Sequence, residues 1–533
     1  MTKFLLLFCL SVLASSCAHM GTNKGIDDSA ETTRAEIPDA QESISEETIE
    51  QADLFGPETD LWGRIRNRFS LSEMEHPRID KQLAWYGRHQ GYMDRVAERA
   101  QPYMHFIVEM LEQEDIPSEL ALLPIVESAF QPFAYSHGRA AGIWQFIPAT
   151  GRRYGLKQNW WYDGRRDVHA STIAAVKFLK ALSRQFKGDW MLALAAYNSG
   201  SGTVRKAIRK NKRLGKPTDF FSLQLPPETR AYVPKLLALK KIIANPAAFD
   251  ITLKAIPNES YFTLVDIKSQ IDLALAAELA DIPINHLYAL NPGHNRWSTP
   301  PNGPHYLLLP NEKVEAFQQK LAELPNQQRI KWIRHKIKNG ETLSSIAMKY
   351  HTSINVIKRV NRIRSKTIRA GRSITIPVAS KSLHSYKLSA NQRRDKKQNI
   401  PRKGIKVTHI VREGDTFWDL SRLHNVGVRQ LAKWNSMAPR DPLVPGTKLI
   451  IWSRTGKQVS HNDPGNITTP LHRRIMKRIG YRVRNGDSLA RISQKFKVSV
   501  NQLLRWNKLN REKVLRPGQS LTLFVDVTRQ SGT

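Results

Sequence analysis

The N-terminal half of the chain carries its hydrophobic residues at helical spacing. An amphipathic run opens at Pro102, and a second stripe follows a capping position at Asp167. A third helix is predicted from Asp189 through Tyr197. The second stripe consists of Ile173, Val176, Leu179, Leu182 and Phe186. Because no alternating strand pattern of comparable length interrupts these runs, we predict a compact all-α domain over residues 61–250, in which most stripe residues serve only as core.

Beyond residue 330 the pattern changes to a short template that occurs three times. Each copy has an alternating strand, a glycine turn, an acidic residue and a Ser or Thr that open a helix, a second helix ending at Asn, and a closing strand. The turn glycines Gly340, Gly414 and Gly486 are 74 and 72 residues apart, which marks an internal repeat. The predicted βααβ units are repeat 1 (residues 333–378), repeat 2 (408–453) and repeat 3 (480–525).

A degenerate module at residues 256–312 precedes these repeats. It has two apolar helical runs and a closing strand ending at Pro310, but it lacks the Gly-Asp-Thr start. We therefore expect it to serve in packing. The segments 379–407 and 454–479 are polar and basic with few apolar residues, and they are predicted to be flexible linkers. The expected architecture is multidomain, an all-α domain followed by small α+β modules.

Charge and cysteine content narrow the class of protein. The formal net charge is +35, which indicates an anionic environment such as nucleic acid, a membrane surface or an acidic wall polymer. Both cysteines, Cys9 and Cys17, lie near the start, so the rest of the chain has no thiol nucleophile or cysteine metal site. The sixteen His show no ligand spacing. The sequence therefore indicates no metal and no cofactor, and it names no regulatory protein partner.

The first residues have the pattern of an export signal. A short cationic start and an apolar run of about eleven residues predict a signal peptide over residues 1–16, too short to span a bilayer. The residues before Cys17 resemble a bacterial lipobox, although Ala14 stands where Leu is usual. The resemblance implies lipidation of Cys17, and Ala18 after it implies the outer membrane, facing the periplasm of a Gram-negative cell. Residues 17–60 would form an acidic tether. Export argues against a nucleic-acid partner.

One acidic residue has an unusual setting. Glu127 follows Leu122, Leu123, Ile125 and Val126, and desolvation in such surroundings raises a carboxyl pKa. A carboxyl that keeps its proton near neutral pH can act as a general acid. Alone, Glu127 would be interpreted as a solvated glutamate at a helix end.

Two further blocks change that interpretation. Gly142-Ile143-Trp144-Gln145 and Ala196-Tyr197-Asn198-Ser199-Gly200 follow the Glu127-Ser128 pair, in the order and spacing of the soluble-lytic-transglycosylase-like family. This resemblance implies a lysozyme-like fold that cleaves peptidoglycan glycan, with Glu127 catalytic. It also implies substrate contacts from six residues. Trp144 stands where the family usually has Met, and its ring could serve as a platform for a sugar or as part of the core. The six are Ser128, Ser136, Gln145, Phe146, Tyr197 and Asn198.

The remaining acids bear on the reaction type. Between Glu127 and Gly200 they are Asp163, Asp167 and Asp189, and Asp167 is better explained as a helix cap or an arginine partner. A single acid calls for a nucleophile from the substrate, which the 2-acetamido group of N-acetylmuramic acid supplies. The product would then be a 1,6-anhydromuramoyl end. Two alternatives stay open. One is a hydrolytic muramidase in which a second acid such as Asp163 or Asp167 activates water, and the other is a non-catalytic peptidoglycan-binding scaffold.

The three repeats resemble the LysM module, which binds GlcNAc-containing glycans. The resemblance implies that the turn after the first strand and the loop after the Asn line a glycan groove, while the acidic and hydroxyl residues also cap a helix. Modules on linkers would add their weak affinities through effective concentration. The implied glycan-binding residues are Gly340, Thr342, Asn361, Gly414, Asp415, Thr416, Asn435, Gly486, Asp487, Ser488 and Asn507.

Overall fold

The computed structural model describes residues 60–365, 367–453, 476–496, 498–507, 509–510 and 515–526. The chain forms two compact units, residues 1–456 and residues 457–533. The predicted signal peptide, the predicted lipidation site Cys17 and nearly all of the predicted acidic tether lie outside the described residues, as does most of the predicted linker 454–479. In the described part no helix is both long enough and apolar enough to cross a bilayer.

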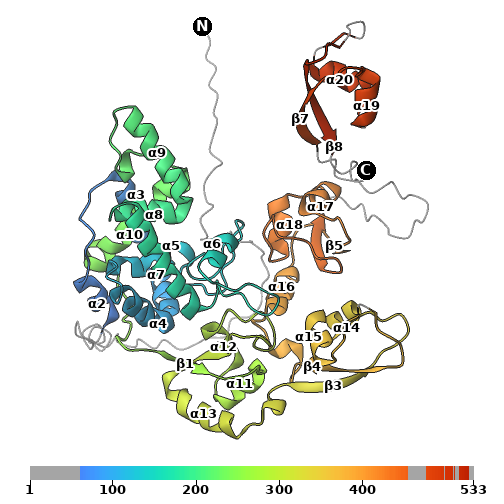
Figure 1. The fold of residues 1–533 in the computed structure, drawn as a ribbon. Coiled ribbons are helices and arrows are strands. Elements are labelled where there is room, and N and C mark those ends of the chain that lie inside the picture. Colours follow the sequence, from blue (N-terminus) through green and yellow to red (C-terminus); the bar gives the residue numbers. More distant parts are fainter. Residues whose placement is uncertain are drawn as a thin grey trace, which may run out of the picture. The chain divides into compact units, whose positions relative to one another are not determined.

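The predicted all-α domain is helical throughout (Figure 1). Its central helices α4, α7, α8 and α10 contribute many of the residues of one hydrophobic core. The cap predicted at Asp167 is confirmed, since its carboxylate accepts from the Ala170 amide. The elements are α2 (Leu61–Asn67), α3 (Pro77–Tyr86), α4 (Gln90–Glu112), η1 (Ser118–Leu122), α5 (Leu123–Ser128), α6 (Pro148–Arg153), α7 (Val168–Gln185), α8 (Trp190–Ser199), α9 (Ser201–Arg213), η2 (Phe220–Ser222), α10 (Pro227–Ala244) and η3 (Ala247–Phe249).

Helix α4 corrects one predicted boundary. It begins at Gln90, twelve residues before the position where the pattern placed its start, and it runs through Pro102. Proline removes one backbone hydrogen bond from a helix interior. Pro102 lies on a partly exposed side of α4. Packing of the long buried stripe from Met93 to Leu111 keeps the helix continuous.

Each of the four modules has the predicted βααβ order and a two-stranded antiparallel sheet. The degenerate module pairs β1 with β2, and repeats 1, 2 and 3 pair β3 with β4, β5 with β6 and β7 with β8. The three repeats each have a separate small core. The degenerate module consists of β1 (Phe262–Asp266), α11 (Leu273–Leu279), α12 (Ile284–Leu290) and β2 (Tyr306–Pro310), and η4 (Asn311–Lys313), α13 (Val314–Glu323) and η5 (Asn326–Arg329) follow it.

The repeats have these bounds. Repeat 1 is β3 (Lys331–Lys336), α14 (Leu343–Lys349), α15 (Ile354–Val360) and β4 (Ser373–Val378). Repeat 2 is β5 (Ile405–Ile410), α17 (Phe417–Leu423), α18 (Val428–Trp434) and β6 (Lys448–Ser453). Repeat 3 is β7 (Met476–Arg482), α19 (Leu489–Lys495), α20 (Val500–Asn507) and β8 (Ser520–Asp526).

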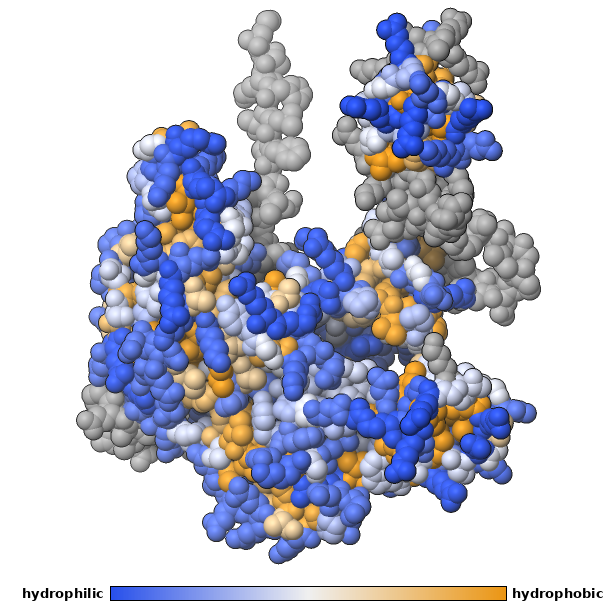
Figure 2. Space-filling view, in the orientation of Figure 1, coloured by the Kyte–Doolittle hydropathy of each residue, from blue (hydrophilic) through white to orange (hydrophobic). Residues whose placement is uncertain are grey.

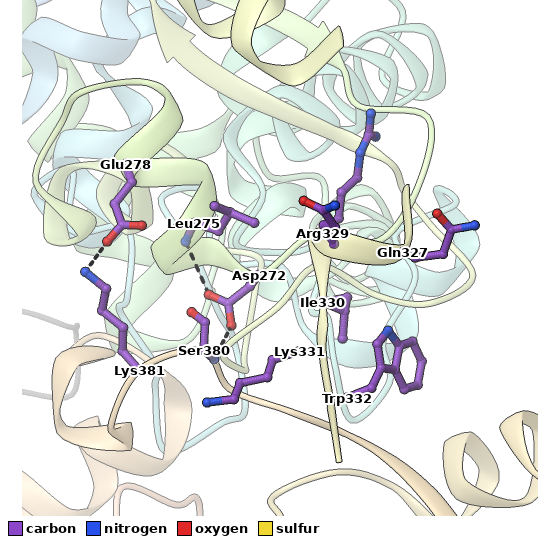
Figure 3. Close-up of a pocket in the computed structure, with 11 residues that line it drawn as sticks. Asp272, Leu275, Glu278, Gln327, Arg329, Ile330, Lys331, Trp332, Ser380 and Lys381 are labelled. Atoms are coloured by element: carbon purple, nitrogen blue, oxygen red, sulfur yellow. Dashed lines mark hydrogen bonds and ion pairs between the residues drawn. The ribbon is translucent and has the colours of Figure 1, made fainter. Parts of the chain in front are cut away.

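The segment 379–407, predicted as a flexible linker, is instead folded. It contains η6 (Leu383–Ser385) and α16 (Ala390–Gln398). Tyr386 is 1 % exposed and its hydroxyl donates to the Asp272 carboxylate, which also accepts from the Ser380 amide. Figure 3 shows the bond between Ser380 and Asp272 beside the ion pair of Lys381 with Glu278, at a cavity of about 590 Å³. A buried tyrosine and buried polar partners outweigh the polar composition from which flexibility was predicted.

The described surface is strongly polar. In the face drawn in Figure 2, hydrophilic side chains project from the helical domain and from the small modules, with hydrophobic patches between them. This is consistent with the large excess of Lys and Arg over Asp and Glu, 82 against 47.

Candidate active site

Glu127 lies at the C-terminal end of the short helix α5. The four residues before it are buried, and Ala129 and Phe130 after it have φ of 49° and 54°. These left-handed conformations are uncommon for residues other than glycine, and they end the helix immediately after Ser128. The apolar run therefore holds the carboxyl at a helix end, within the hydrophobic core but with part of its surface open.

The surroundings of Glu127 raise its pKa to about 7. Burial is the main cause, and the negative charge of Glu228 acts in the same direction, while the hydroxyl of Tyr232 and the charge of Lys235 lower the pKa. The Tyr232 hydroxyl donates to Glu127 Oε1 at 2.5 Å. A carboxyl with this pKa exchanges a proton near neutral pH, as the sequence predicted from its apolar neighbours.

Tyr232 was missed by the sequence analysis. It belongs to α10, 105 residues after Glu127, in a run that the pattern marks only as helical core. A phenol within that apolar stripe was the one available signal, because a buried hydroxyl needs a partner.

Tyr197 lies beside this carboxyl without bonding to it. Its hydroxyl donates to the Trp144 carbonyl at 2.8 Å, while the charge of Glu127 helps to raise the pKa of the phenol. Its ring packs against Phe146, with centroids 6.5 Å apart, and against Phe178. Tyr197 thus lies close enough to Glu127 to feel its charge, and its hydroxyl anchors the Gly142–Phe146 turn.

Ser128 and Phe146 do not have the surface that substrate contact requires. Both are 2 % exposed. The Ser128 hydroxyl bonds to the carbonyls of Pro124 and Ile143, at 3.2 and 3.0 Å, so it fastens helix α5 to the turn. The Phe146 ring packs in the core. These two predicted substrate contacts are wrong because the side chains face inward.

The Gly142–Phe146 turn has a demanding backbone. Gly142 has φ of +80°, and a Cβ there would lie 2.0 Å from the Arg165 carbonyl oxygen, so only glycine fits. Gln145 has φ of 49° and is 9 % exposed, and its amide donates to the Gly142 carbonyl at 2.7 Å. Strain of this kind in a non-glycine residue is typical of functional sites. Trp144 is fully buried and bonds to Thr172, so it is core and not a sugar platform.

Ser136 and Asn198 are partly exposed. The Ser136 hydroxyl accepts from the Ala140 amide at 3.0 Å, which closes its loop, and the side-chain carbonyl of Asn198 accepts from the Thr229 hydroxyl at 2.8 Å. The Ser136 hydroxyl can still donate a hydrogen bond, because the bond to Ala140 uses it as acceptor. The predicted substrate roles of these two residues stay predictions.

Neither aspartate considered as a second acid is free. Asp163 accepts from Arg165 through both carboxylate oxygens and from Arg166, and these arginines hold its pKa below its usual range despite its burial. Asp167 caps α7 and accepts from the hydroxyls of Tyr162 and Tyr306. Both carboxylates are thus occupied in structural bonds.

The Ser136 loop also contacts repeat 2. The Tyr135 hydroxyl donates to the Asp441 carboxylate at 2.8 Å, and the Arg139 guanidinium lies 2.8 Å from the same carboxylate. The Arg139 carbonyl in turn accepts from Arg165. Asp441 belongs to the loop between α18 and β6, so this loop of the repeat helps to fix the loop that carries Ser136.

The asparagines of the repeats have a structural role. In repeat 2 the Asn435 side chain is fully buried; it donates to the carbonyls of Leu431 and Ile450 and accepts from the Ile450 amide. Asn361 and Asn507 make the same three bonds, and so does Asn291 of the degenerate module. The predicted glycan contact through these side chains is therefore wrong, because their hydrogen-bonding groups join the second helix to the closing strand.

The acidic residues of the turns close the turn itself, and the hydroxyl residues cap the following helix. Asp415 accepts from His409 and from the Arg412 amide, and Asp487 accepts from Tyr481 and from the Arg484 amide. Thr342, Thr416 and Ser488 are helix N-caps. The glycines Gly340, Gly414 and Gly486 have φ of 79°, 89° and 82°, as the turns require. The predicted capping is thus confirmed for the hydroxyl residues and not for the acidic residues, and glycan contact at these turns stays a prediction.

In the degenerate module the corresponding loops are bonded to each other. The Thr299 amide donates to the Ile271 carbonyl, and the Thr299 hydroxyl accepts from the Ile271 amide. The Leu273 amide donates to the Trp297 carbonyl. Trp161 of the helical domain, 5 % exposed, packs against Trp297. The packing role expected for this module agrees with these contacts. Among the described residues, no group of three or more His, Cys, Asp or Glu is placed to hold a metal.

Comparison with known proteins gives three domain matches. Residues 104–220 match the transglycosylase SLT domain, and residues 261–326 match the LysM-like domain of the lytic transglycosylase MltD. Residues 335–377, 409–452 and 481–524 match the LysM domain. The three LysM ranges coincide with the three repeats. The match at residues 261–326 identifies the degenerate module as LysM-like.

Whole relatives are also similar. The chain is 36 % identical over 412 residues to membrane-bound lytic murein transglycosylase D of Escherichia coli K12, covering 75 % of this chain and 86 % of that protein. It is 45 % identical over 122 residues to a putative tributyltin chloride resistance protein of an Alteromonas species, covering 23 % of this chain and 59 % of that protein.

Among solved structures, an inactive mutant of the lytic transglycosylase Slt of Pseudomonas aeruginosa matches at 22 % identity. The match covers 28 % of this chain and 25 % of that chain, with a TM-score of 0.22, too low to support an argument. The family follows instead from the identity and coverage of the Escherichia coli relative. The chain belongs to the membrane-bound lytic murein transglycosylase D family.

Proposed function

We propose that this protein is a peptidoglycan lytic transglycosylase, a lyase that cleaves the β-1,4 bond between N-acetylmuramic acid and N-acetylglucosamine without water. Glu127 protonates the leaving oxygen while the substrate's acetamido oxygen attacks its own anomeric carbon, and the glycosidic bond breaks. Glu127 then removes the proton of the 6-hydroxyl, whose oxygen attacks the anomeric carbon, displaces the acetamido oxygen and closes the 1,6-anhydro ring. The single observation that carries this proposal is the Glu127 carboxyl, with a pKa of about 7 and a hydrogen bond from Tyr232.

The positions of the other acids support a single-carboxylate mechanism. Asp163 and Asp167 are held in structural bonds, so neither is available to activate water. Glu228, exposed in the first turn of α10, is the carboxylate whose charge acts on Glu127. A hydrolytic reaction on this site would therefore depend on Glu228, which the sequence analysis did not consider.

Repeats 1 to 3 target the enzyme to the wall through glycan binding. The turn glycines with their neighbouring Thr or Ser remain the proposed contact residues, while the asparagines support the module from inside. We further propose that Cys17 is lipidated and anchors the protein in the outer membrane, facing the periplasm. The partners are then glycan strands and the membrane.

Mass spectrometry of the soluble products released from purified sacculi tests the reaction. Wild-type protein is expected to release 1,6-anhydromuropeptides, and Glu228→Gln is expected to release the same products. Glu127→Gln is expected to bind sacculi and release nothing. Reducing muramic ends that disappear in Glu228→Gln would establish hydrolysis instead, and undiminished cleavage by Glu127→Gln would remove Glu127 from the mechanism.

A further inference from the structure

Repeat 2 has a cavity of about 680 Å³ that the proposed function does not use. The loop between α17 and α18, helix α18, the outer end of β6 and the residues before β5 form its wall. Its chemically distinctive lining residues are Arg402, Lys403, Gln430, Lys433, Trp434 and Trp452.

Its charges are uncompensated. None of Arg402, Lys403 and Lys433 forms an ion pair with an acidic residue in the part of the chain that the structure describes. The positive charges of Lys433 and Arg402 also act on the neighbouring Lys397, whose pKa is lowered by burial and by these two charges. Like charges gathered at one concave surface destabilise the free protein and attract an anion.

Two indoles complete the wall. Trp434 is 5 % exposed and belongs to the core of repeat 2, and the partly buried Trp452 packs against that core. The indole nitrogen of Trp452 is buried and has no hydrogen-bond partner among the described residues. A buried donor without an acceptor is costly, and aromatic faces accept apolar and peptide groups. The site thus combines cations with the partly exposed apolar surface of Trp452.

This cavity is separate from the glycan groove that the LysM resemblance implies. That groove lies between the turn at residues 412–416 and the loop at 436–447, and none of those residues lines the cavity. Repeat 1 lacks both indoles: the strand registers place Pro377 at the position of Trp452, and Val360 precedes Asn361 where Trp434 precedes Asn435. The cavity is therefore not a general property of the module's fold.

We propose that this cavity of repeat 2 binds a short peptide that carries carboxylates, the chemistry of the peptide stems on peptidoglycan. Arg402 and Lys433 pair with the carboxylates, and the indoles contact the aliphatic and amide parts. The hollow shape favours a short ligand over a flat anionic bilayer. The proposal rests on the proposed function, since peptidoglycan supplies the stems, and it gives repeat 2 a second contact with the polymer besides the glycan.

Fluorescence anisotropy of a labelled synthetic tetrapeptide with two free carboxylates and no sugar tests this site on the full chain. We expect weak, salt-sensitive binding. Replacing the three cations with glutamine, Arg402→Gln, Lys403→Gln and Lys433→Gln together, should weaken it about tenfold, as expected from losing three partly exposed charge contacts. The same peptide with both carboxylates amidated should not bind.

A matched control removes the same charge elsewhere on repeat 2. Arg412, Arg429 and Lys448 are exposed and do not line the cavity. Their triple glutamine variant should change the affinity by less than about twofold. Equal weakening by both variants would overturn the site in favour of general charge attraction. Tighter binding of vesicles with an anionic lipid than of the peptide, lost in the cavity variant alone, would assign the cavity to a membrane surface.

The two proposals fail separately. The cavity variant should still release peptide-free saccharides with 1,6-anhydromuramoyl ends, at the wild-type rate, from glycan strands stripped of peptide, because Glu127 is untouched. Loss of peptide binding with that activity intact supports the cavity site. Peptide binding by a wild-type chain that releases no anhydromuropeptides would refute the proposed reaction and leave the cavity assignment standing. Wild-type chain that does not bind the peptide refutes the cavity assignment alone.

Discussion

Replacing Tyr232 with phenylalanine isolates one interaction of the proposed acid. The Tyr232 hydroxyl donates to Glu127 Oε1 at 2.5 Å, and this bond lowers a carboxyl pKa that burial otherwise raises. A hydrogen bond to a charged group contributes about 1.5–3 kcal/mol, and one pKa unit corresponds to about 1.4 kcal/mol. Tyr232→Phe should therefore raise the Glu127 pKa by about one to two units above its value of about 7.

The sign of the effect on activity follows from the role of Glu127. A general acid works while it is protonated, so the rate is retained below its pKa and falls as the pH rises through it. The alkaline limb of the rate profile should lie near pH 7 in the wild type, where Glu127 loses its proton. In Tyr232→Phe this limb should move upward by about one to two pH units.

The assay is the initial rate of soluble muropeptide release from sacculi between about pH 5 and pH 10, with folding followed by circular dichroism at each pH. Tyr197→Phe is the matched control, because its hydroxyl bonds to the Trp144 carbonyl and not to Glu127, and its limb should stay in place. A limb that does not move in Tyr232→Phe, or that moves to lower pH, would refute the assignment of Glu127 as the titrating acid.

Three further outcomes are expected. Glu127→Gln should be about 3 kcal/mol more stable to denaturant than wild type at pH 8, and the difference should vanish near pH 4. The reason is that the fold raises the Glu127 pKa from 4.5 to about 7 and so opposes its ionisation. Equal stability of the two proteins at both pH values would contradict the burial argument. Ser128→Ala should lower the free energy of unfolding by about 1–3 kcal/mol while glycan affinity holds, since the hydroxyl bonds only to the Pro124 and Ile143 carbonyls; thermal denaturation and sacculus binding measure the two effects. Asp441→Asn should raise KM about two- to fivefold with little change in kcat, because it removes one partly exposed charge contact with the Ser136 loop; steady-state kinetics on glycan strands separates the two constants.

The candidate acid could be found from the sequence because its cause is local. The apolar residues that raise the Glu127 pKa are its immediate neighbours. Asp167 caps α7 as predicted, and Asp189, the predicted start of the next helix, caps α8. The repeats were likewise visible, since each βααβ unit is closed by contacts among residues of one short segment. Periodicity and capping act within a few residues, so the sequence alone determines these elements.

The roles of individual side chains depended on directions that a linear pattern does not contain. Ser128 and Phe146 stand in the predicted block, but the turn directs them inward. The asparagines of the repeats lie at the predicted positions, but their side-chain amides are hydrogen-bonded to the second helix and the closing strand. In both cases the residue was located correctly and its partner was not, because a side chain's partners are set by the fold around it.

The sequence by itself determined the helical domain, the four modules and the apolar setting of Glu127. Only the tertiary structure decided that Tyr232 bonds to that carboxyl, that Asp163 and Asp167 are occupied, and that the segment 379–407 is folded through Tyr386. The physical reason is the distance along the chain over which each interaction acts. Local propensity and desolvation arise between neighbours in the chain, whereas these bonds join residues on separate elements that meet only when the core packs.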